Sequence, residues 1–147
     1  TLTDEATNEV KTLQYRDLDG NGPTPPVITA DNLDANASYV GNVEFLNELE
    51  DPAQDITEEV TQEAVDHQVF YVGAATLNIE TEYLDFDANN NPLGVQFRLT
   101  TGEASTGNFS VVLIHDGDKF AEGVADGNLT NAGGETDIEA NFNVAIE

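Results

Sequence analysis

The sequence predicts an all-β protein, an antiparallel immunoglobulin-like β-sandwich of about seven strands with one short helix. Most segments alternate apolar and polar residues with period two, and the turns between them are rich in Gly, Asn and Asp. A single segment instead repeats apolar residues every four positions. The length of 147 residues suits one domain spanning 1–147. A small barrel is the alternative arrangement of the same strands.

Alternating apolar side chains mark the strands in order along the chain. They are Leu13 and Tyr15; Tyr39, Val43 and Phe45; the run HQVFYV from His67 to Val72; Leu77, Ile79 and Tyr83; Leu93, Val95, Phe97 and Leu99; Phe109, Val111 and Leu113; and Ile138, Phe142, Val144 and Ile146. The stretch DANNNPLG, from Asp87 to Gly94, is typical of a hairpin connection.

The helix is predicted over about 56–66, because Ile56, Val60 and Ala64 recur every four residues. Asp55 stands where it can cap the N-terminus, and Glu58 occupies the capping-box position three residues later. We expect this helix to lie across an end or an edge of the sheet.

The charge balance excludes some classes of partner. Four basic residues stand against 29 acidic ones, which gives a formal net charge of −25. Nucleic acid and anionic lipid are bound through Lys and Arg, so neither is expected as a partner. Such a surface attracts cations and is relieved by salt, which favours a salty or cation-rich setting over the alternative of a merely soluble surface. No apolar run approaches 18 residues, so no direct insertion into a membrane is expected.

Five stretches together resemble a family of small exported proteins of Bacteroidota-type bacteria, whose members are often lipid-anchored. The stretches are YRDLDGNG, LDANASYVGNVEFLNE, DPAQDITEEVTQEAVDHQVFYV, STGNFSVVLIHDGDK and GGETDIEANFNVAIE. The resemblance covers nearly the whole chain and implies a β-rich fold at the cell surface, outside the cell or in the periplasm. The family is largely uncharacterised, so the resemblance implies no activity.

The first residues also favour export. The chain opens on Thr1 without a Met and contains no Cys. The letters TLT alternate like the end of a strand, so we expect a mature form cut from a precursor, with any anchor or preceding strand segment lying outside these residues.

The loop YRDLDGNG predicts a calcium site. Asp17, Asp19 and Asn21 alternate as the first ligands of a calcium loop do, and calcium prefers such oxygen ligands. An EF-hand would need Glu at loop position 12, where this chain has Ile28. The alternative interpretation is a plain polar turn between two strands.

Two other turns carry the same kind of spacing. Asp116 and Asp118 lie in HDGDK and are candidate cation ligands. Asp85, Asp87 and Asn89 repeat the pattern in DFDANNNP, where a hairpin turn explains them fully.

The two histidines predict a second metal site. His67 opens one strand and His115 closes another, so antiparallel pairing of these strands would bring the imidazoles together at one end of the sandwich. Two His and a carboxylate suit zinc or another late transition metal. The expected carboxylates are Glu63, Asp66, Asp116 and Asp118. The alternative is that His67 interacts with the helix C-terminus and His115 is a hydrogen-bonded strand end.

Catalytic motifs are absent from the sequence: it contains no G-x-S-x-G, no P-loop and no H-E-x-x-H. We therefore expect a non-enzymatic, exported binding module that holds divalent cations in acidic strand-end loops. The alternative is a structural subunit of an extracellular filament or surface layer, self-associating or joining another surface protein through its terminal strands.

Overall fold

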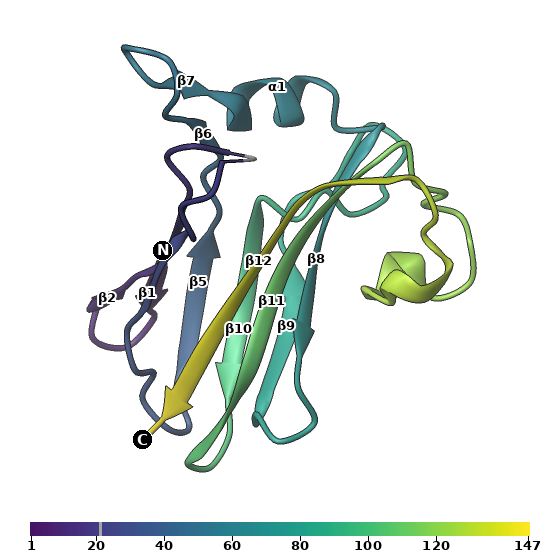
Figure 1. The fold of residues 1–147 in the computed structure, drawn as a ribbon. Helices are drawn as coiled ribbons and strands as arrows, with labels where there is room; N and C mark the ends of the chain where they lie inside the picture. The colour runs from purple at the N-terminus through teal and green to yellow at the C-terminus, as the bar shows by residue number, and fades with distance from the viewer. Residues whose placement is uncertain (21) are drawn as a thin grey trace.

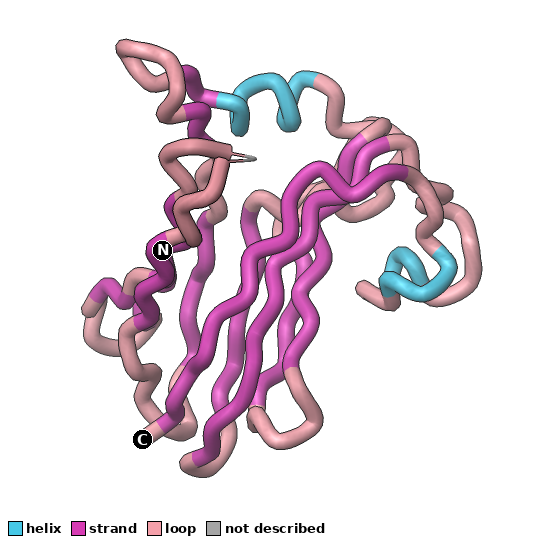
Figure 2. The backbone as a smooth tube through the Cα atoms, in the orientation of Figure 1, coloured by secondary structure: helices cyan, strands magenta, loops and turns pink. Residues whose placement is uncertain are grey.

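Antiparallel strands are the main secondary structure of the protein, and the described residues contain one α-helix. The computed structural model describes residues 1–20 and 22–147. Figures 1 and 2 show the strands running in two layers, with the helix across one end. The elements in order are β1 (Leu2–Asp4), β2 (Val10–Lys11), β3 (Leu13–Arg16), β4 (Val27–Ala30), β5 (Ser38–Asn42), β6 (Leu46–Asn47), β7 (Gln54–Asp55), α1 (Ile56–Gln62), β8 (His67–Gly73), β9 (Ile79–Tyr83), β10 (Gln96–Thr101), β11 (Ser105–His115), the 3₁₀ turns Val124–Asp126 and Leu129–Asn131, and β12 (Glu135–Ile146).

Two sheets form the body of the molecule. One has five strands in the order β2-β1-β5-β10-β9, and the other has three in the order β12-β11-β8. Two-stranded ribbons, β3-β4 and β6-β7, lie beside them. Every pairing between these strands is antiparallel, which confirms the predicted all-β class.

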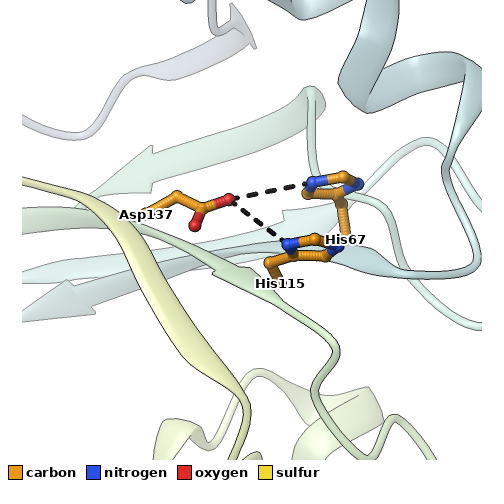
Figure 3. A group of neighbouring side chains, drawn as sticks. All are labelled: His67, His115 and Asp137. Atoms are coloured by element: carbon orange, nitrogen blue, oxygen red, sulfur yellow. Dashed lines mark ion pairs between the residues drawn. The ribbon is translucent and has the colours of Figure 1, made fainter.

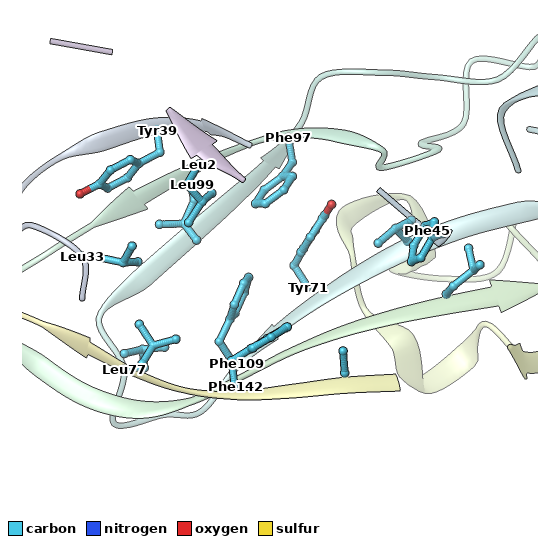
Figure 4. Close-up of a cluster of buried hydrophobic side chains, with 14 of the residues drawn as sticks. Leu2, Leu33, Tyr39, Phe45, Tyr71, Leu77, Phe97, Leu99, Phe109 and Phe142 are labelled. Atoms are coloured by element: carbon cyan, nitrogen blue, oxygen red, sulfur yellow. The ribbon is translucent and has the colours of Figure 1, made fainter. Parts of the chain in front are cut away.

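The main core lies between the two sheets and follows from the period-two pattern. Tyr71 of β8 stacks on Phe97 of β10 with ring centroids 3.9 Å apart, so aromatic side chains join the sheets directly (Figure 4). Tyr39, Leu99, Phe109 and Phe142 are buried in the same cluster. Alternation therefore places one face of each sheet in a shared core.

The other face of β8 and β11 is buried as well. Phe70, Val112 and Ile114 point away from the main core and pack against Val124 and Ala132. The segment that follows β11 thus covers the back of the three-stranded sheet. For that reason, apolar residues occupy both the odd-numbered and the even-numbered positions of these two strands.

The helix α1 is capped as predicted but is shorter. The Asp55 side chain accepts a hydrogen bond from the Thr57 amide, and Val60 is buried. The Glu58 side chain accepts a hydrogen bond from the Gln62 side chain at 3.1 Å. This contact runs along the helix and takes the place of the expected capping box. The helix ends at Gln62 instead of about Asp66, and a turn leads into β8. Among the residues that the structure describes, none of the helical segments has the length and hydrophobicity of a membrane span.

Candidate metal centre

His67 and His115 meet at one end of the three-stranded sheet. They are register partners in the antiparallel pairing of β8 and β11. Their rings stack with centroids 4.5 Å apart and planes 7° from parallel (Figure 3). His67 alternates with Val69 and Tyr71, and His115 alternates with Leu113, so both rings lie on the core side of the sheet. The predicted meeting of the two imidazoles is confirmed.

The tautomer of His67 follows from its surroundings. Its Nδ1 lies 3.1 Å from the Glu63 carbonyl oxygen, at the end of α1, and the ring is buried. A carbonyl oxygen only accepts, so Nδ1 carries the proton and Nε2 presents a lone pair. A histidine held in this way by a backbone carbonyl is oriented as metal-ligating histidines are.

Asp137 supplies the carboxylate of the cluster. Its Oδ2 lies 3.8 Å from Nε2 of His67 and 4.0 Å from Nδ1 of His115 (Figure 3). Within the described residues, these three side chains form the group that could hold a metal ion, with candidate ligand atoms all within 4.8 Å of one another.

A β-bulge in β12 places Asp137 there. Leu113 pairs with Ile138, but its neighbour Ile114 pairs with Thr136, so Asp137 is the extra residue. Strict alternation from Ile138 would point Asp137 away from the core. A bulge re-aims one side chain, and here it joins the face that carries the histidines. The sequence pattern contained no sign of this irregularity, which is why Asp137 was not predicted.

The cluster must rearrange to hold a metal ion, because its candidate ligand atoms lie up to 4.8 Å apart. Donor atoms around a tetrahedral ion with bonds of about 2.0–2.1 Å are roughly 3.3–3.5 Å apart, so the contacts to Asp137 must shorten by about half an ångström. The stacked rings must also tilt, because a metal ion lies in the plane of each ligating imidazole. The His115 side chain is 39% exposed and the Asp137 side chain 38%, so both have room to turn toward solvent.

The carboxylates expected near the histidines lie around this group. Oδ1 of Asp116 is 3.8 Å from Nε2 of His115, whereas it is the other ring nitrogen, Nδ1, that faces Asp137. The Asp66 carbonyl accepts the Asp116 amide at 2.7 Å, and Glu63 contributes its carbonyl to His67. Asp118 uses its side chain to accept the Phe120 amide at 3.0 Å. Asp116 is thus adjacent to the cluster, whereas Asp118 caps its own turn.

The opening acidic loop satisfies its carboxylates internally. Oδ1 of Asp17 accepts the amides of Asp19 and Gly20, and Oδ2 of Asp19 accepts the amide of Thr24. The Thr24 hydrogen bonds lower the pKa of Asp19. Asn21 lies outside the described residues. Within those residues, neither aspartate belongs to a group of three metal-ligating side chains, so calcium binding here stays a prediction.

A buried ion pair between two turns was not predicted from the sequence either. Lys119 Nζ donates to Asp87 Oδ2 at 3.0 Å and to the carbonyls of Ala64 and Pro92. Burial lowers the pKa of Lys119, although Asp87 acts in the opposite direction. Asp87 also accepts the amides of Asn89 and Asn91, as the hairpin interpretation requires. Its partner Lys119 stands in the turn HDGDK, and nothing in that local pattern points to the distant hairpin.

The arrangement can therefore bind a proton or a metal ion between two imidazoles and one carboxylate. Neutral imidazole and carboxylate are ligands of late transition metals, and the partly exposed side of the group leaves a position open to water. Comparison with protein families, with curated proteins and with solved structures finds no match for this chain.

Proposed function

We propose that this protein is an exported, non-enzymatic binding module that holds a late transition metal ion such as zinc at His67, His115 and Asp137. The observation that carries the proposal is the convergence of Nε2 of His67, Nδ1 of His115 and Oδ2 of Asp137 at one sheet end. The backbone carbonyl that orients His67 supports it further. His67, His115 and Asp137 would hold the metal ion, and His115 would have to leave the ring stack for both imidazoles to direct a lone pair at one point.

The scaffold of this proposal is an immunoglobulin-like β-sandwich, which the strand order supports. Seven strands read β1-β5-β10-β9 in one sheet and β12-β11-β8 in the other. In chain order these correspond to A-B-E-D and G-F-C, the arrangement of the constant-type immunoglobulin fold. Sites at the strand ends of such sandwiches commonly bind ligands.

Export and capture of cations are supported by charge. The formal charge of −25 raises the local concentration of divalent ions around the centre. All four basic side chains are paired with carboxylates, so they offer little repulsion to an approaching cation. A cell-surface or periplasmic module with these properties would capture metal ions.

Zinc titration of matched variants tests the proposal. Zinc should stabilise the natural protein by about 2.7 kcal/mol at 100 times its dissociation constant, because a ligand that binds only the folded state shifts unfolding by mass action. Asp137→Asn and His67→Ala should remove most of this stabilisation. Asp116→Asn is the matched control, since it removes the same charge beside His115 and leaves the three proposed ligands in place.

Cobalt and magnesium separate a specific site from general screening. Cobalt(II) in the centre should give the visible absorption of a low-coordinate ion, lost in Asp137→Asn. Magnesium prefers an octahedral oxygen site and should stabilise all variants equally. Equal zinc stabilisation of Asp137→Asn and Asp116→Asn would show that zinc only screens the acidic surface, and the proposal would fail.

A further inference from the structure

A cleft opens between the two sheets, and none of the three proposed metal ligands lines it. Its volume is about 710 Å³, within the range of ligand-binding clefts. Apolar side chains of both sheets line it, among them Phe97, Phe109, Val111, Ile138, Ala140 and Phe142. Residues 12–17, on and beside β3, form part of another wall. Phe97, Phe109 and Phe142 are almost fully buried, so the cleft ends against side chains of the main core.

One border of this cleft is the free edge of β12. Figure 1 shows β12 at the outside of its sheet, with β11 on the other side. Near its end, the Ala145 carbonyl accepts the Leu33 amide at 2.8 Å, and the Glu147 amide donates to the Leu33 carbonyl at 2.9 Å. Odd-numbered residues there point their backbone groups away from β11.

The odd-numbered residues earlier in β12 also point their backbone groups away from β11. The backbone groups of Glu139, Asn141 and Asn143 point the same way by alternation, and within the described residues they have no backbone hydrogen bond on that side. The β3–β4 ribbon also approaches β12, so an added strand has to fit beside that ribbon. Their even-numbered neighbours Ala140 and Phe142 face the cleft. An unpaired edge beside an apolar cleft is what an added strand requires.

The charge around the cleft indicates what kind of strand fits. Its wall carries Asp17, Glu44 and Asp55, while Arg16 is held by Glu48 at 2.7 Å. Glu139 stands exposed on the outer face of β12. Opposite charges at facing positions of two neighbouring strands stabilise their pairing.

We propose that the cleft binds an extended peptide segment of a partner protein, in which apolar and basic residues alternate. The segment pairs with the backbone of Glu139, Asn141 and Asn143 and adds a fourth strand to the three-stranded sheet. Its apolar side chains enter the cleft beside Ala140 and Phe142, and its basic side chains lie on the outer face of the sheet with Glu139.

Synthetic heptapeptides test the proposal. A peptide of alternating Lys and Val with blocked ends should bind the natural protein with one-to-one stoichiometry. The matched peptide of alternating Glu and Val should not bind. A third peptide, N-methylated at alternate residues so that it cannot donate to one edge, should bind at least about tenfold more weakly, because main-chain hydrogen bonds supply much of the affinity in strand addition.

Hydrogen exchange locates the peptide and distinguishes pairing from charge attraction. Amide exchange of Glu139, Asn141 and Asn143 should slow when the Lys–Val peptide is added. Ala140→Trp fills the cleft and should abolish binding, whereas Val72→Lys, an exposed change on β8, should leave it intact. Binding that tolerates N-methylation, or that leaves the three amides unprotected, would overturn the proposal, as would no binding at low salt.

Discussion

The ammonium of Lys119 is held between segments that are distant in sequence, and its only carboxylate contact within 4.0 Å among the described residues is Asp87. The Asp87 side chain is fully buried. Asp87→Asn should therefore lower the free energy of unfolding by about 3–5 kcal/mol, because it leaves a buried charge without its partner. Urea unfolding measures this loss. Asp126→Asn, an exposed change of the same kind, should cost less than about 0.5 kcal/mol, and a similarly small loss for Asp87→Asn would contradict the ion pair.

The same carboxyl sets a dependence on pH. Burial raises the pKa of Asp87, but the hydrogen bonds from Asn91 and Lys119 lower it by more than burial raises it. The pKa in the folded state therefore lies below the ordinary value of 3.8. A carboxyl of this kind adds stability above its unfolded pKa and loses it as pH falls through the folded pKa. The stability difference between the natural protein and Asp87→Asn should be full at neutral pH and shrink from about pH 4 downward. Urea unfolding at a series of pH values checks this, and a constant difference would refute it.

At the scale of the elements, the connection between β9 and β10 packs its backbone against β8. Gly94 has φ of +91°, and a Cβ there would lie 2.7 Å from the Val69 carbonyl oxygen. Gly133 also has positive φ, at +59°, but a Cβ there would meet nothing within 4 Å. Gly133→Ala should cost roughly 1–2 kcal/mol from backbone strain alone. Gly94→Ala should cost about 1–3 kcal/mol more, because the clash adds to the strain. Equal losses in thermal unfolding would show that the connection shifts freely.

The elements also show how far the sequence could predict this structure. Period-two alternation located β8, β10, β11 and the final part of β12, and antiparallel pairing brought His67 to His115. Asp137 could not be predicted, because a bulge breaks the alternation through which a strand is recognised. The partnership of Lys119 with Asp87 was equally hidden, since it depends on how two turns fold against each other. Regular pairing can be predicted from local pattern, whereas irregular pairing and loop contacts depend on the tertiary structure.

For the whole molecule, repulsion between carboxylates opposes the compact state. The four basic side chains are each within 4.0 Å of a carboxylate, and the formal charge is still −25. Salt shortens the Debye length to a few Å near roughly 0.5 M, so the Tm should rise between low salt and that concentration. Calorimetry in sodium chloride measures the change, and choline chloride at equal ionic strength should reproduce it. A Tm that stays flat in both salts would show that the acidic side chains are too far apart to repel one another appreciably.

The pairing of Leu33 with Ile146 has a consequence for the order in which the chain can fold during synthesis. β1 and β5 can pair as soon as residue 42 has left the ribosome. β8 can pair only after β11 has been synthesised. The edge around Leu33 finds its backbone partners only when residues 145–147 have emerged. Nascent chains lacking those residues must expose the Leu33 segment, and folding that depends on such distant contacts is slow. Premature termination shortly before Ala145 should therefore yield chains that chaperones retain and proteases remove, even though most strands are already present.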